Sequence, residues 1–116
     1  MMAFSEFEIK KIDKEMSEYI EKIRPPAHIR KELDFECRLN KQSIELFEVR
    51  PHWQDKAKKT YGGVFKATYT KTIGKWKLYW MRADLKWHRY EPYPEAQTLK
   101  EVLSVVESDE YACFFG

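Results

Sequence analysis

The feature that most constrains the fold is an uninterrupted alternation of apolar and charged residues over positions 33–39, Leu-Asp-Phe-Glu-Cys-Arg-Leu. Successive side chains of a β-strand point to opposite faces of a sheet, so a period of two indicates a strand that is buried on one face only. The polar residues 40–42 predict a turn directly after it. The chain is therefore expected to build an antiparallel sheet with one solvated face.

The predicted return strand covers residues 43–50 and does not keep a single phase. Its apolar positions shift from Ile44 and Leu46 to Phe47 and Val49. A β-bulge near Leu46-Phe47 would turn all four side chains toward the core.

Further strands are expected at residues 64–72, 75–82 and 85–90, where short apolar alternations are separated by turn residues. Between the second and third strands, residues 52–63 are polar, rich in lysine and closed by Gly62-Gly63. This composition predicts a long loop.

Two helices are expected to flank the strands. Ser5 and Glu8 form a capping box, and apolar residues recur at steps of three and four from there to Ile23. A second capping box begins at Thr98 and is followed by a short apolar stripe. The predicted fold class is α+β, with an N-terminal helix, a five-strand antiparallel meander, a short C-terminal helix and both helices packed on one face of the sheet.

Composition limits what the chain can be. Its 116 residues are 43% hydrophobic and 16% aromatic, which predicts a folded chain with a single domain over residues 1–116. No run approaches the roughly 18 apolar residues of a membrane-spanning helix, and the start lacks the pattern of a secretory signal. We therefore expect a cytoplasmic protein without a membrane partner.

Cysteine and histidine give no sign of a metal or redox site. Cys37 and Cys113 lie far apart in the sequence, and so do the three histidines, so no pair has metal-ligand spacing. Two reduced, buried thiols and no cofactor are expected.

The run at residues 78–92, LYWMRADLKWHRYEP, resembles the bacterial domain-of-unknown-function family 3024. Residues 23–26, 28–30, 47–53 and 109–116 are similar to that family as well, and their order spans most of the chain. The resemblance implies no activity, cofactor or catalytic residue, because none is assigned to the family.

The formal charge of +2 conceals an uneven distribution. Residues 50–90 carry 11 Lys and Arg against 2 Asp and Glu, together with all four tryptophans, and acidic segments flank them. Basic and aromatic side chains on a sheet are what proteins use to bind single-stranded nucleic acid. We expect a binding module for an anionic partner, single-stranded nucleic acid or another polyanion. Its candidate residues are Lys56, Lys58, Lys59, Lys66, Lys75, Lys77, Tyr79, Lys86 and His88, with Tyr90 exposed beside them.

The same alternation allows a different interpretation, in which the tryptophans belong to the core. In residues 75–80 the positions of Trp76, Leu78 and Trp80 share one face, and Lys75, Lys77 and Tyr79 share the other. The exposed side would then be a lysine-rich surface.

An enzyme is the first alternative function. With the bulge near Leu46-Phe47, Asp34 would lie opposite Glu48 with Glu36 beside them, and a divalent metal could bridge the three carboxylates. Such a site would suit a metal-dependent nuclease. Arginines could instead neutralise the carboxylates, and Arg50 stands where a lysine would be expected. The balance favours a protein without enzymatic activity.

A protein-interaction or homodimerisation module is the second alternative. The C-terminal segment 111–116, Tyr-Ala-Cys-Phe-Phe-Gly, is too apolar to remain in solvent. It must either pack on its own domain or dock on a second copy of the chain.

Overall fold

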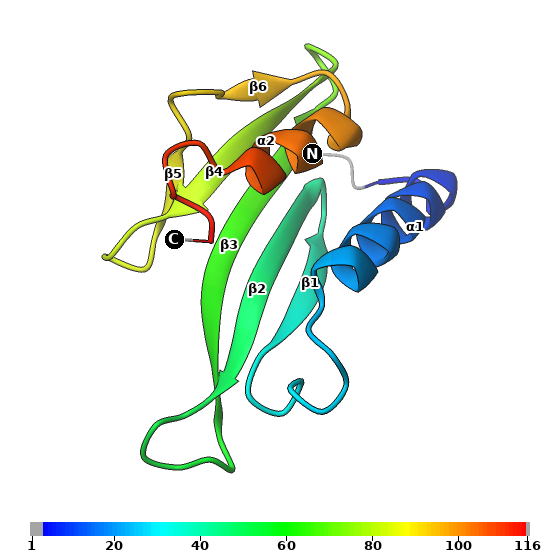
Figure 1. Cartoon of the computed structure of the whole chain (residues 1–116). Coiled ribbons are helices and arrows are strands. Elements are labelled where there is room, and N and C mark those ends of the chain that lie inside the picture. The colour runs from blue at the N-terminus through cyan, green and yellow to red at the C-terminus, as the bar shows by residue number, and fades with distance from the viewer. Residues whose placement is uncertain (1–3, 116) are drawn as a thin grey trace.

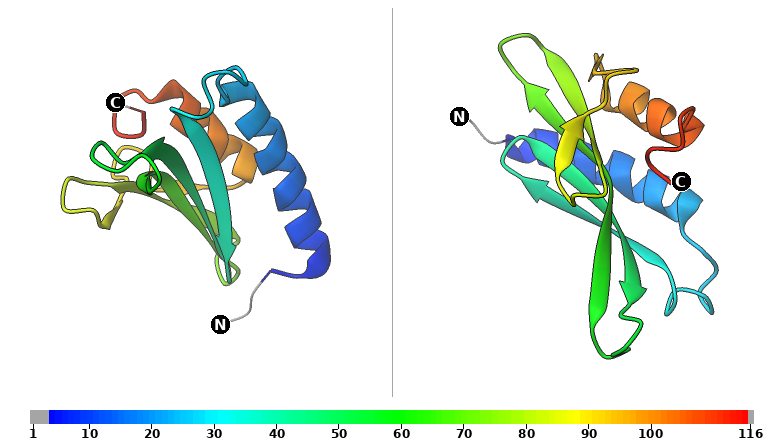
Figure 2. Two further views of the ribbon diagram at one scale, coloured as in Figure 1. Left: turned by 90° about the horizontal axis from the view of Figure 1, so that it is seen from below. Right: turned by 90° about the vertical axis from the view of Figure 1, so that its left-hand side faces the viewer.

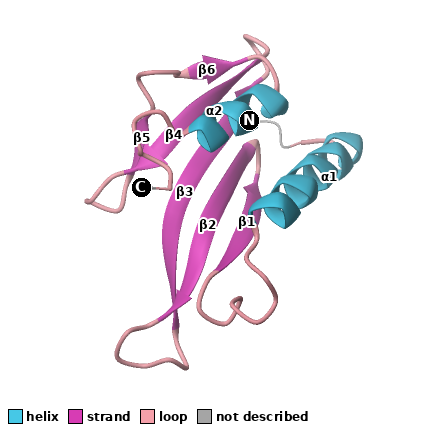
Figure 3. Cartoon of the chain, viewed as in Figure 1, coloured by secondary structure: helices cyan, strands magenta, loops and turns pink. Residues whose placement is uncertain are grey.

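The computed structural model describes residues 4–115 and shows the predicted α+β architecture (Figure 1). In chain order the elements are α1 (Glu6–Ile23), β1 (Asp34–Asn40), β2 (Ser43–Pro51), β3 (Lys59–Thr70), β4 (Lys75–Met81), β5 (Trp87–Arg89), β6 (Glu95–Ala96) and α2 (Leu99–Ser108). Helices and strands are distinguished by colour in Figure 3.

The two helices begin where the capping residues predict. At α1, the Glu8 amide donates to Ser5 Oγ (3.2 Å) and the Ser5 amide donates to Glu8 Oε1 (2.9 Å), so the capping box is complete. At α2, the Glu101 amide donates to Thr98 Oγ1 (3.1 Å), but the Glu101 carboxylate accepts from the Gln97 amide instead of the Thr98 amide. These bonds satisfy backbone donors that have no partner within the helix.

The strands form one antiparallel sheet in the order β1-β2-β3-β4-β5, and β6 also pairs with β4. The predicted meander of five strands is confirmed, and β6 is an addition to it. The prediction of a loop over residues 52–63 was wrong in part, because β3 begins at Lys59 and runs through Gly62 and Gly63.

The predicted bulge lies at Leu46-Phe47, but its extra residue is on the neighbouring strand. Leu46 pairs with Phe65 and Phe47 pairs with Gly63, so Val64 of β3 has no partner in β2. The pairing of β1 with β2 is regular throughout. Both Val64 and Phe65 are buried, and the bulge therefore changes which face β3 presents on either side of it.

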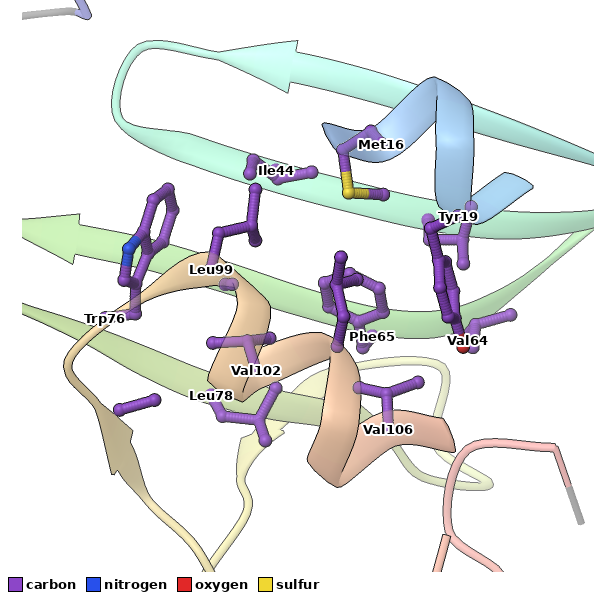
Figure 4. Packing of buried hydrophobic residues seen from close by; sticks show 14 of the residues in the cluster. Met16, Tyr19, Ile44, Val64, Phe65, Trp76, Leu78, Leu99, Val102 and Val106 are labelled. Carbon is purple, nitrogen blue, oxygen red and sulfur yellow. The ribbon is translucent and has the colours of Figure 1, made fainter. Parts of the chain in front are cut away.

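Both helices cover the same face of a curved sheet (Figure 2). In the core, Leu99, Val102 and Val106 of α2 face the strands that carry Phe65 and Leu78 (Figure 4). Met16 and Tyr19 of α1 complete the cluster beside Ile44 and Val64. Burial of this apolar surface is the main force that holds helices and sheet together. Within residues 4–115, no helix is both long and apolar enough to span a membrane.

The C-terminal segment packs against its own chain. Phe114 is buried, with its ring 4.7 Å from the ring of Tyr90. The Asp109 carboxylate accepts hydrogen bonds from the amides of Phe114 and Phe115, both at 2.9 Å. Of the two expectations for this segment, the described residues 111–115 show the intramolecular one.

Candidate anion-binding surfaces

The face of the sheet away from the helices, called the outer face below, carries the predicted lysines of β3 and β4. The sheet register places Lys66 opposite Tyr79, Thr68 opposite Lys77 and Thr70 opposite Lys75. Directly paired residues of antiparallel strands point to the same side, so all six side chains share the outer face. In the left view of Figure 2 both helices lie on the opposite side of the sheet.

Three lysines of this face, Lys66, Lys75 and Lys77, are half-buried by their neighbours. Within the described chain, none of their ammonium nitrogens has a carboxylate oxygen within 4.0 Å. Two carboxylates lie across from them, Glu45 opposite Lys66 and Glu95 opposite Lys77. Glu45 accepts a hydrogen bond from the indole Nε1 of Trp87 (3.0 Å). The register thus places the three lysines on one face of two paired strands, where their ammonium groups are available to an external anion.

The interpretation that tryptophans of β4 belong to the core is confirmed for Trp76, which is 6% exposed. Trp80 is half-buried against the same core. Trp53 in the loop between β2 and β3 is 81% exposed, and its ring stacks on His52 at 6.0 Å.

The predicted orientation of β5 was wrong. Met81 pairs with Trp87, and Trp80 pairs with His88, so Trp87 is on the outer face and His88 is on the helix side. His88 Nε2 lies 2.8 Å from Asp84 Oδ2. Lys86 is exposed in the turn, and Tyr90, which was expected at the surface, is 2% exposed. The reason is the turn, where Leu85 adopts a positive φ of 62° and sets the phase of the following strand.

A second, smaller apolar cluster lies on the outer face, between the three lysines and the β2–β3 hairpin. The ring of Phe47 lies 6.0 Å from that of Trp87 and 6.4 Å from that of Tyr61. The guanidinium of Arg38 covers Phe47 and Tyr61 at 4.6 and 4.8 Å from the ring centres. Phe47 was expected to point to the main core, and the regular pairing with Glu36 places it on the opposite side instead.

Gly63 allows Trp87 and Met81 to pack directly against the backbone of β3 in this cluster. This glycine is the sequence feature that could have indicated the cluster. A Cβ at Gly63 would lie 2.7 Å from Cη2 of Trp87 and 2.8 Å from Cε of Met81. A glycine inside a strand often marks such a close approach. The composition of residues 52–63 predicts that Gly62-Gly63 closes a loop, whereas in the structure both glycines lie within β3.

The three candidate metal ligands do not converge, which corrects the predicted register. Asp34 pairs with Val49, and Glu48 pairs with Phe35 and therefore points to the other side of the sheet from Asp34. Among residues 4–115 no group of three or more His, Cys, Asp or Glu side chains is placed to hold a metal ion.

Each of these carboxylates has an arginine partner instead. Asp34 accepts two hydrogen bonds from Arg24 (2.7 and 2.8 Å), and these bonds hold the pKa of the Asp34 carboxyl below its usual range. Glu36 accepts from Arg38 at 2.7 Å, and Glu48 lies 3.6 Å from the Nε of Arg50. Neutralisation by arginine was the simpler of the two expectations for these residues.

The cysteines are free thiols and each is half-buried. Burial raises the pKa of Cys37 to about 11, and the charge of Asp13 adds to this effect. Burial also raises the pKa of Cys113. Both side chains therefore carry their protons at neutral pH and are poor nucleophiles.

A hollow of about 470 Å³ lies where the β2–β3 hairpin meets the loop between α1 and β1. Lys56 and Lys59, both predicted site residues, line it, and Lys58 does not. Its remaining lining residues are Arg30, Lys31, Asp34, Phe35, Glu36, Val49, Arg50, Pro51 and Tyr61. The hollow thus joins five cationic side chains, two acidic ones and two aromatic rings.

A family model for a domain of unknown function, DUF3024, matches residues 4–116. The chain belongs to this family. Neither the curated proteins nor the solved structures include a significant match to it. The description of DUF3024 assigns no activity, so the function of this DUF3024 chain has to be argued from its geometry.

Proposed function

We propose that this protein is a cytoplasmic, non-enzymatic single-domain module that binds single-stranded nucleic acid on the outer face of its sheet. The observation that carries the proposal is a group of three lysines, Lys66, Lys75 and Lys77, that share one face with Tyr79 and have no carboxylate partner within residues 4–115. Ammonium groups neutralise phosphates, and an accessible ring can stack on a base. The free thiols Cys37 and Cys113 suit a reducing compartment.

The shape of the sheet supports a strand-like ligand. Along β3, the outer face presents Lys59, Tyr61, Gly63, Lys66 and Thr68 in order, with the bulge between Gly63 and Lys66. Twelve residues of extended chain span about 40 Å at roughly 3.3 Å per residue. An extended backbone of phosphates could follow this line from the lysines to the hairpin.

The experiment is a fluorescence anisotropy titration with a labelled oligothymidine that has no terminal phosphate. If three lysines contact three phosphates, raising NaCl from about 50 to about 200 mM should weaken binding by about 20-fold, because each contact on a single strand contributes about 0.7 to the logarithmic salt slope. The variant Lys66→Gln/Lys75→Gln/Lys77→Gln should bind more weakly and show a flatter salt dependence.

The matched control removes the same charge from the helix side. Lys10, Lys11 and Lys14 are exposed on α1, and their replacement by glutamine should leave the affinity within about twofold, since salt screens charges beyond about 10 Å. Equal loss in both triple variants, or binding that does not respond to salt, would overturn the proposed function.

A further inference from the structure

The hollow between the α1–β1 loop and the β2–β3 hairpin has a different set of side chains from the group Lys66, Lys75 and Lys77. Its volume of about 470 Å³ falls within the range of about 300–1,000 Å³ that small-ligand sites occupy. In Figure 1 the hairpin extends beyond both helices, with the α1–β1 loop beside it.

The two acidic residues that line the hollow are paired with arginines that do not line it. Asp34 is held by Arg24 through two hydrogen bonds, and Glu36 is held by Arg38. Neither Arg24 nor Arg38 lines the hollow. The carboxylates therefore do not offset the charge of the lining cations in full.

The five lining cations have few partners of their own. Within residues 4–115, Lys31, Lys56 and Lys59 have no carboxylate oxygen within 4.0 Å. Arg30 donates its Nε to the Pro25 carbonyl (3.0 Å), which orients the guanidinium and leaves its two terminal nitrogens for another acceptor. The Nε of Arg50 is 3.6 Å from Glu48, a loose contact.

An aromatic wall lies beside these cations. Tyr61 is 44% exposed and its ring is covered on one side by Arg38, which leaves ring surface toward the hollow. Clustered cations bind a group with concentrated negative charge through charge-assisted hydrogen bonds. A neighbouring aromatic ring favours a flat group that can stack on it. A phosphate monoester carries a charge of about −1.5 to −2 at pH 7, and a nucleoside phosphate combines both features.

We propose that the hollow binds a nucleoside monophosphate group, with the phosphate among Arg30, Lys56 and Lys59 and the base against Tyr61. This inference rests on the proposed function where the group is the phosphorylated end of a bound strand. A free nucleotide offers the same chemistry, and the test distinguishes the two sources.

The test compares one oligothymidine with and without a terminal phosphate, together with thymidine monophosphate and thymidine, by calorimetric and anisotropy titration. The terminal phosphate should tighten binding by about tenfold, as expected for hydrogen bonds to a doubly charged group. Lys56→Gln/Lys59→Gln should abolish this difference, whereas the outer-face triple variant should keep it. Arg30→Gln/Lys31→Gln, in the α1–β1 loop, gives a second test should the first double variant fail to fold.

The outcomes separate the two proposals. If the oligothymidine without phosphate binds with a steep salt dependence but the terminal phosphate adds nothing and the mononucleotide does not bind, the hollow inference is overturned and the proposed function stands. If the mononucleotide binds, this binding is lost in Lys56→Gln/Lys59→Gln, and no oligothymidine binds, then the hollow is a nucleotide site and the proposed function fails. If thymidine binds as tightly as its monophosphate, the phosphate site is refuted.

Discussion

Replacing Gly63 by alanine should lower the free energy of unfolding, because the added methyl group would clash with side chains of the outer-face cluster. The new Cβ would lie 2.7 Å from Cη2 of Trp87 and 2.8 and 2.9 Å from Cε and Sδ of Met81. These separations are about 1 Å short of the 3.5–4.0 Å at which two such atoms attract each other. Met81 can move, because its side chain is flexible.

Trp87 cannot move without loss. Its indole donates to Glu45 at 3.0 Å and its ring packs against Phe47. A tilt that makes room for the methyl group breaks that hydrogen bond, which costs about 1 kcal/mol, and loosens the ring contact. We therefore expect Gly63→Ala to lower the free energy of unfolding by about 2–3 kcal/mol, within the usual cost of overpacking. The melting temperature should fall by about 10 °C.

Gly62 provides the matched control, since a Cβ there would meet no atom of residues 4–115 within 4 Å. Gly62→Ala should be neutral or stabilising by up to about 1 kcal/mol, because alanine loses less backbone entropy on folding. Urea unfolding followed by tryptophan fluorescence and circular dichroism measures both variants. In the double variant Gly63→Ala/Trp87→Phe, the smaller ring should recover part of the loss, a non-additivity of at least about 1 kcal/mol. Equal stabilities for the two alanine variants would refute the close packing at Gly63.

Two further predictions concern the main core. The hydroxyl of Tyr19 is buried without a hydrogen-bond partner among residues 4–115, and burial together with nearby carboxylates raises the pKa of Tyr19 to about 12. From about pH 10 upward the unfolded state therefore releases this proton first and wild-type stability falls. Tyr19→Phe should be neutral or stabilising by about 1 kcal/mol at pH 7 and should lose less stability than the wild type between about pH 10 and 12; a variant with the wild-type alkaline profile would contradict this assignment. Phe114 is 5% exposed and Phe115 is 37% exposed, so Phe114→Ala should cost about 3 kcal/mol and Phe115→Ala clearly less in denaturant unfolding. The mass in solution should stay that of the wild type, and a change in mass with unchanged stability would show that the segment docks on a second copy.

Local signals in the sequence were sufficient for most of the architecture. The alternation of residues 33–39 and the capping residues Ser5 and Thr98 correspond to β1, α1 and α2 in the structure. These patterns are reliable because they arise from interactions between residues close in sequence, namely hydrogen bonds of the first helical turn and the alternating faces of one strand.

The errors arose where the residue types of one segment do not determine its structure. The sequence of β2 shows that the apolar pattern shifts by one residue at Phe47. It does not show whether the extra residue of the bulge lies in β2 or in β3, because that depends on how the two strands pair. The orientation of β5 depends on the backbone of Leu85, a residue type that rarely adopts a positive φ. β6 has two residues, which is too few to show any period.

The candidate site was predictable in the same uneven way. Lys66, Lys75 and Lys77 follow from alternation alone, because Lys66 and Lys77 lie between core residues and Lys75 directly precedes one. The predicted directions of His88 and Tyr90 were wrong because both depend on the phase of β5. That Lys59 and Arg30 line the same hollow could not be predicted, since it brings together the start of β3 and the α1–β1 loop, two segments that share no sequence pattern.

The bulge at Val64 lets one continuous strand serve both sides of the sheet. Before it, Tyr61 and Gly63 belong to the outer surface, and after it, Phe65 belongs to the core beneath the helices. If β3 kept a regular alternation through Val64, then Lys59, Tyr61 and Gly63 would lie on the same face as Phe65, the helix side. Lys59 and Tyr61 would then turn away from the hollow, so a single unpaired residue sets the geometry of a surface several residues away.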